Sequence, residues 1–232
     1  MKLLSPAKTH NASRIQPQRH PRSQSGNVFF IILIGIALFG ALAFSLTRST
    51  QTSTVTKMSE RELLLNIADI RSYGQRLKRA VDKVRRNGCS ENDISFVNTI
   101  VTEYAHASTV SDKCQIFNTS GGSASWQTSP IENRQYEIWG SESVTGLGTA
   151  DKSELILTLS LTGYANLCAL YNEEHDLGSA IPNGTDDDNA TRFTGTFTDA
   201  APTILEFPGS LTGCYNENAS GDYTLYMVLL ER

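Results

Sequence analysis

The feature that most constrains this chain is an apolar run of 19 residues, 28–46, that contains no charged side chain. A helix rises about 1.5 Å per residue and the hydrocarbon core of a bilayer is about 30 Å thick, so a helix of this length can just span a membrane. A core helix of a globular protein is the alternative, but such a helix is seldom apolar on every face. The sequence therefore predicts a transmembrane helix over residues 27–46.

Basic residues predict how this helix is oriented. Residues 1–26 carry five basic side chains and no acidic one, whereas the region after Thr47 mixes both signs. Loops rich in Lys and Arg stay on the cytoplasmic side of a membrane. We therefore expect a cytoplasmic basic leader at residues 1–26, a single span, and the rest of the chain on the outer side.

Four cysteines, Cys89, Cys114, Cys168 and Cys214, all lie on the predicted outer side. They show no Cys-x-x-Cys or Cys/His spacing of the kind that binds zinc. Two disulfides in an oxidising compartment are the simplest interpretation, and four reduced, buried cysteines are the alternative. Of the three pairings we favour Cys89 with Cys114 and Cys168 with Cys214, because each closes a loop within one region of the chain.

Charge is divided unevenly along the sequence. Residues 1–88 hold 15 Lys/Arg and 4 Asp/Glu, whereas residues 89–232 hold 5 Lys/Arg and 20 Asp/Glu. The first part is therefore strongly basic and the second, which we call the head, strongly acidic. This asymmetry suits contacts between neighbouring copies, and it equally suits simple solubility of an exported domain. An acidic head argues against nucleic acid as a partner.

Residues 47–88 are predicted to form a helical stalk, and its second half is clearly amphipathic. Ser59 and Glu62 match a capping box, and Asn87-Gly88 supplies a C-terminal stop. Between them, apolar or small residues recur at spacings of three and four: Leu63, Ile67, Ile70, Gly74, Leu77, Val81 and Val84. We expect this face to pack on a sheet of the head, with a coiled-coil seam as the alternative, and Gly74 to mark close packing or a bend.

The head, residues 89–232, reads as short strands joined by turns rich in Gly, Ser, Thr and Asn. Strands are predicted at residues 94–96, 115–117, 135–140, 155–161 and 222–230, with residues 142–144 leading into a turn, and a helix at residues 163–177. About 144 residues suffice for one core. The predicted fold class is α+β: a long N-terminal transmembrane-plus-amphipathic helix followed by a disulfide-braced head with an antiparallel sheet.

Taken in order, these segments resemble bacterial type IV pilin-like and pseudopilin-like proteins. The matching pieces are Gly26 followed by NVFF, the apolar run, the amphipathic helix and the cysteine-bearing head. The segments NGCSENDISFVN and KCQIFNTSGGSASW also resemble a group of uncharacterised bacterial anchored proteins. The resemblance implies a single-pass protein of the bacterial inner membrane with a periplasmic or extracellular head. Its implied partners are the lipid bilayer, other pilin-like subunits of a type IV pilus or type II secretion-like filament, and a prepilin peptidase that cleaves between Gly26 and Asn27.

One position departs from the family pattern. Typical pilins carry Glu five residues after the cleaved Gly, and Ile31 stands there in this chain. Some tip-type minor subunits also lack this Glu, so the departure favours an initiating or capping subunit. Residues 41–43 read Ala-Leu-Ala, a signal peptidase pattern whose cleavage would release the head as a soluble protein.

The sequence offers little chemistry of other kinds. Asp186, Asp187 and Asp188 lie in a Gly/Asn/Thr-rich stretch and are weak candidates for calcium ligands, with a solvated loop as the preferred interpretation. No hydrolase, zinc-protease, P-loop or dinucleotide motif occurs, so we expect no enzyme and no cofactor. Two hypotheses remain: a noncatalytic pilin-like subunit, and a stand-alone membrane-anchored periplasmic binding or adhesion module.

Overall fold

The computed structural model describes residues 30–38, 59–184, 192–199, 203–204 and 206–232. The chain divides into two compact units, residues 1–56 and 57–232. Residues 30–38 of the first unit are helical. No helix in the ranges just given is both long enough and apolar enough to cross a membrane. The leader and most of the predicted transmembrane helix lie outside the described residues.

The helix α2 (Glu60–Arg86) confirms the amphipathic segment. The Ser59 hydroxyl accepts a hydrogen bond from the backbone N–H of Glu62 at 3.3 Å, which satisfies one of the unpaired donors at the start of the helix. Asn87 caps the C-terminus, and Gly88 follows with φ of +85°. The buried residues of α2 are Ile67, Ile70, Tyr73, Gly74, Leu77, Ala80, Val81 and Val84.

The strands form one sheet in the order β3-β5-β6-β2-β1-β4. They are β1 (Tyr136–Val144), β2 (Glu154–Ser160), β3 (Asn183–Gly184), β4 (Thr203–Ile204), β5 (Thr212–Glu217) and β6 (Asp222–Leu230). The four longer strands pair antiparallel, whereas the two-residue strands β3 and β4 add parallel pairs at the two edges. The α+β class and the antiparallel sheet are confirmed, and β3, β4 and β5 are strands that the sequence did not predict.

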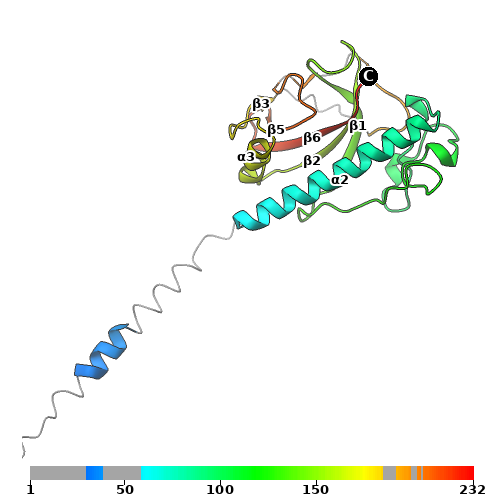
Figure 1. The fold of residues 1–232 in the computed structure, drawn as a ribbon. Helices are drawn as coiled ribbons and strands as arrows, with labels where there is room; N and C mark the ends of the chain where they lie inside the picture. The colour runs from blue at the N-terminus through cyan, green and yellow to red at the C-terminus, as the bar shows by residue number, and fades with distance from the viewer. Residues whose placement is uncertain (1–29, 39–58, 185–191, 200–202, 205) are drawn as a thin grey trace, which may run out of the picture. The chain divides into compact units, whose positions relative to one another are not determined.

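One face of this sheet is covered by α2 and by α3 (Ala165–Glu174), as Figure 1 shows. Successive side chains of a strand point to opposite faces of the sheet, and in the central strands the side chains on both faces are buried. Leu155, Leu157 and Leu159 of β2 belong to the core shared with α2 and α3. Ile156, between them, belongs to a second cluster on the opposite face, which includes Phe207. The packing of α2 on the sheet of the head is therefore as predicted.

Gly74 lies where α2 comes closest to the sheet. A Cβ atom at this position would overlap the Sδ atom of Met227 on β6 and would lie 3.5 Å from Leu157 on β2. Glycine in a helix interior costs about 1 kcal/mol relative to alanine, so its presence needs a reason. Close packing is that reason, and it is one of the two roles predicted for Gly74.

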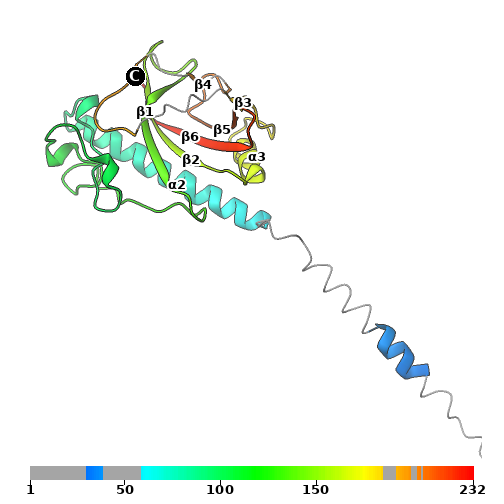
Figure 2. The same cartoon turned by 180° about the vertical axis from the view of Figure 1, so that it is seen from behind.

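The segment between α2 and β1 contains three short 3-10 helices, Glu91–Asp93, Thr102–Tyr104 and Asp112–Cys114. It lies at the C-terminal end of α2, away from α3 (Figure 2). The strands predicted at residues 94–96 and 115–117 are wrong: only an isolated parallel bridge joins Ser95 to Gln115. Turns flank both three-residue stretches, so neither extends into a ladder.

Both disulfides have the predicted pairing. Cys89 bonds to Cys114, which we call the loop disulfide, and Cys168 bonds to Cys214, which we call the helix–strand disulfide. Asn172 reinforces the second link, because its side-chain amide donates to the backbone oxygen of Cys214 and accepts from the backbone N–H of the same residue, both at 2.8 Å. The disulfide and this amide pair fix α3 to β5.

Candidate functional site

An open groove of about 330 Å³ lies in the segment at the end of α2. Its walls come from three stretches that are separate in sequence. The lining residues are Val97, Asn98, Thr99, Ile100, Gln115, Phe117, Asn118, Ala124, Ser125 and Trp126. This volume is at the lower end of the range for small-molecule sites. The groove combines aliphatic, aromatic, amide and hydroxyl side chains, and no lining residue is charged.

The first wall is held in place by Asn98. Its side-chain Oδ1 accepts hydrogen bonds from the backbone N–H groups of Ile100 (2.9 Å) and Val101 (2.7 Å), and its Nδ2 donates to the carbonyl of Phe96 at 3.0 Å. An Asn side chain that satisfies backbone groups in this way fixes a turn. The rim therefore has a defined shape, and it presents Ile100, which is 65% exposed.

The second wall is a tight turn after the loop disulfide. Backbone hydrogen bonds join Gly122 to Gln115 (3.0 Å) and Ala124 to Ile116 (3.1 Å). A Cβ atom at Gly121 or Gly122 would overlap backbone carbonyl oxygens of residues 115 and 116. The two glycines therefore allow the chain to fold back closely on itself, and this brings the stretch 124–126 beside the stretch 115–118.

Aromatic rings connect the lining of the groove to the interior of the head. The Trp126 ring lies 5.7 Å from that of Phe117, edge to face, and 5.7 Å from the buried ring of Tyr104. The Tyr104 hydroxyl accepts a hydrogen bond from the backbone N–H of Ile138 on β1 at 2.9 Å. Aromatic pairs of this geometry stabilise by about 0.5–1.5 kcal/mol beyond their burial. Trp126 is therefore positioned by contacts that extend to the central sheet.

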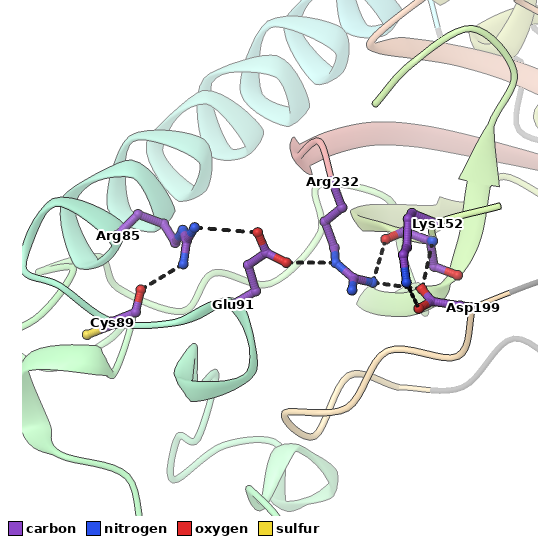
Figure 3. A network of polar contacts seen from close by, with 7 residues as sticks. Arg85, Cys89, Glu91, Lys152, Asp199 and Arg232 are labelled. Atoms are coloured by element: carbon purple, nitrogen blue, oxygen red, sulfur yellow. Dashed lines mark hydrogen bonds and ion pairs between the residues drawn. The ribbon is translucent and has the colours of Figure 1, made fainter. Parts of the chain in front are cut away.

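A second polar cluster surrounds Arg232 and is shown in Figure 3. The Arg232 guanidinium bonds Glu91 at 2.9 Å and Asp199 at 3.0 Å, and it donates to the carbonyl of Ser153 at 3.1 Å. It also lies 3.7 Å from the centre of the Phe197 ring. The side chain is only 12% exposed. This cluster joins four segments that are far apart in sequence, so its evident role is structural.

The neighbouring carboxylates extend this cluster. Glu91 also pairs with Arg85 of α2 at 3.4 Å, and Lys152 approaches Asp199 at 2.6 Å. The hydrogen bond from Lys152 is the main reason that the pKa of Asp199 lies below its ordinary value. Part of the basic charge of α2 is thus paired with the acidic head of the same chain.

A buried carboxyl group, Glu154, lies at the start of β2. Its Oε2 accepts a hydrogen bond from the backbone N–H of Val144 at 2.8 Å, whereas its Oε1 is buried without a hydrogen-bond partner among the described residues. Burial raises the pKa of Glu154 to about 7. Glu142 is its register partner on β1 and is also buried. Buried acids with a raised pKa are found in active sites, and this pair lies within the antiparallel pairing of β1 with β2.

The other predicted site residues lie outside the described residues. These are the processing residues Gly26 and Asn27 and the calcium candidates Asp186, Asp187 and Asp188. Within the described residues, no group of three or more His, Cys, Asp or Glu side chains is arranged to hold a metal ion. The four cysteines are structural, since both pairs are disulfides.

The sequence did not predict the groove or the Arg232 cluster. The groove joins three loop stretches, and its only signal in the sequence is a pair of aromatic residues, Phe117 and Trp126, on either side of a Gly-Gly turn. Arg232 and Glu91 are 141 residues apart, so no local pattern links them. The chain matches no protein-family model, no curated protein and no solved structure in the comparisons made.

Proposed function

We propose that this protein is a noncatalytic, membrane-anchored pilin-like subunit, in the position of a minor or tip subunit of a type IV pilus or type II secretion-like filament. The observation that carries the proposal is the helix at residues 30–38. Its seven large apolar side chains are all between 45% and 68% exposed: Phe30, Ile31, Ile32, Leu33, Ile34, Ile36 and Leu38.

Such a helix requires an apolar environment on every side. Burying one large apolar side chain is worth about 1.5–3 kcal/mol, and contiguous exposed apolar surface of this kind marks an interaction site. A bilayer supplies that environment to a single chain, and a bundle of identical helices supplies it in a filament. This helix is also part of the longer uncharged run, residues 28–46, which follows a basic leader.

The second unit is consistent with a pilin-like head. Its first element is a long helix, α2, whose apolar face packs on an antiparallel sheet, and both disulfides lie after that helix. Disulfides of this kind persist in oxidising compartments such as the periplasm. The proposed orientation therefore has the N-terminus in the cytoplasm and the head in the periplasm or outside the cell.

Ile31 is the reason that we propose a tip or minor subunit rather than a major one. This residue is 61% exposed and carries no charge with which to pair with the amino terminus of a neighbouring subunit. A subunit that lacks such a pair is better suited to begin or cap a filament than to extend it.

The mature N-terminus tests the proposal. The full chain is expressed in its native host with and without the host's prepilin peptidase, and its N-terminal residue and intact mass are measured. We expect a start at Asn27 that depends on the peptidase and is lost in Gly26→Val. Ala43→Leu is the matched control, since it blocks only the signal peptidase pattern. A start at Phe44 that is lost in Ala43→Leu would show a released protein, and an intact Met1 would show an uncleaved anchor.

The second candidate, a stand-alone anchored binding or adhesion module, is favoured by the groove at the end of α2. The groove is open, uncharged and held by a disulfide and by side-chain hydrogen bonds, as expected of a binding site. Isolation of the protein as single copies with an intact Met1 would support this candidate over the pilin-like subunit.

A further inference from the structure

We infer that the groove at the end of α2 binds a neutral saccharide. The inference is independent of how the protein is anchored, since it depends only on the residues that line the groove. Three features of these residues carry it: the absence of charge, the supply of hydrogen-bonding groups and the presence of a supported aromatic side chain.

The lining is uncharged on a domain that is otherwise strongly acidic. None of the ten lining residues is charged, although residues 89–232 hold 20 Asp/Glu against 5 Lys/Arg. A charged ligand group would find no oppositely charged side chain in the lining, so its desolvation would not be compensated there. The side chains next to the lining are not uniformly acidic, since Lys83 and Arg76 of α2 donate to Ser123 and Gln127. The ligand that matches this lining carries no net charge.

The polar groups of the lining suit hydroxyl partners. Gln115 uses its Nε2 to bond Val110 and Asp112, and Asn118 uses its Oδ1 to accept from Ser120. The opposite ends of the two amides, Gln115 Oε1 and Asn118 Nδ2, make no hydrogen bond among the described residues. One acceptor and one donor on neighbouring side chains can bind sugar hydroxyls, because each hydroxyl both donates and accepts.

The apolar part of the lining supplies a surface for a sugar ring. Trp126 and Phe117 line the groove together with Val97 and Ile100. The C–H faces of a sugar are apolar and its edges are polar, so a ligand of this class uses both kinds of surface at once. A purely apolar peptide side chain would leave the amide groups of the groove unpaired and desolvated, which is unfavourable. A neutral saccharide is therefore preferred over an apolar peptide.

The groove is also rigid before any ligand arrives. The loop disulfide, the Asn98 turn and the close Gly121-Gly122 turn each fix one wall. A site that is already ordered loses less conformational entropy on binding than a mobile loop. This favours binding by a small ligand, which offers few contacts.

The fluorescence of Trp126 tests the inference. The chain has two tryptophans, so Trp139→Phe leaves Trp126 as the only one. The full chain is held in a zwitterionic detergent without a sugar headgroup and titrated with glucose, galactose, N-acetylglucosamine and their short oligomers. Glucuronate, glucosamine and an uncharged leucine-rich peptide are titrated in parallel. We expect a saturable change in Trp126 emission with at least one neutral saccharide and weaker binding of the charged sugars.

Substitutions then locate the site. Asn118→Ala removes the Nδ2 donor offered to the saccharide together with the Oδ1 acceptor of the Ser120 N–H, and it is expected to weaken binding by at least about 2-fold. Asn92→Ala, an exposed asparagine outside the groove, is the matched control and should leave binding unchanged. Stronger binding by oligomers than by single sugars would indicate a polymer as the natural source. No saturable change with any neutral saccharide, binding of the peptide alone, or equal binding by Asn118→Ala would overturn the inference.

Discussion

The buried carboxyl group of Glu154 makes the stability of the head depend on pH in an unusual direction. Because burial raises the pKa of Glu154 from 4.5 to about 7, the folded chain binds a proton that the unfolded chain has released between these two pH values. A pKa difference of this size corresponds to about 3 kcal/mol. Stability from this group is fully present below about pH 4.5 and is lost as the pH rises to about 7.

Glu154→Gln removes this dependence while preserving the local structure. Glutamine keeps an oxygen that can accept from the backbone N–H of Val144, and it has nearly the same volume. The free energy of unfolding of the variant, relative to the wild type, should therefore increase by about 3 kcal/mol between pH 4 and pH 8. Urea unfolding followed by circular dichroism, with both disulfides intact, measures this difference at each pH.

A matched control separates burial from the loss of charge. Glu132→Gln changes an exposed carboxylate before β1 and should shift the unfolding free energy by less than about 0.5 kcal/mol at every pH. Parallel pH curves for the wild type and Glu154→Gln would refute the reasoning, since they would mean that Glu154 has the same pKa in the folded and unfolded chain.

Three further predictions concern packing, charge and covalent links, and each is checked by urea unfolding of the full chain at neutral pH. Gly74→Val should destabilise by about 1–3 kcal/mol because it overlaps Met227, whereas Gln75→Val on the exposed side of α2 should cost less than about 1 kcal/mol. Arg232→Gln should cost about 1–3 kcal/mol, because it removes two ion pairs and one backbone hydrogen bond from a side chain that is only 12% exposed, whereas Lys152→Gln, 45% exposed, should cost less than about 1 kcal/mol. Replacing the cysteines of the helix–strand disulfide by serine should cost about 4 kcal/mol, and replacing those of the loop disulfide slightly less, because the sequence separations are 46 and 25. For each of the three predictions, equal stabilities of the two variants compared would contradict the argument.

Local sequence patterns predicted the elements that have clear end signals, a periodic apolar face or a long apolar run. The apolar stripe of α2 and its two caps gave correct bounds, and the apolar runs of β2 and β6 are long enough to identify as strands. β5 was missed because its sequence, TGCYNE, contains Gly and Asn, which have low strand propensity, and only Cys214 and Tyr215 to bury. Its antiparallel pairing with β6, its short parallel pairing with β3 and the helix–strand disulfide keep it in the sheet, and these contacts are tertiary.

The candidate site was harder to predict than the fold. The groove depends on an Asn98 turn, a Gly-Gly turn and a disulfide that bring loops together, and none of these has a periodicity. The predicted processing and calcium residues could be chosen from local spacing alone. Predicting a groove made of three separate stretches requires knowing how the chain is arranged in space, and the spacing of neighbouring residues does not show this.

The position of β6 has a consequence for the order in which the chain can fold. β6 lies between β2 and β5 and contacts α2, yet it is made after all of them. A nascent chain that stops before residue 222 leaves the inner edges of β2 and β5 without partners, and part of the α2 apolar face uncovered. Such open edges and apolar faces are where chains aggregate. We therefore expect the core of the head to close only after residue 230 has been synthesised.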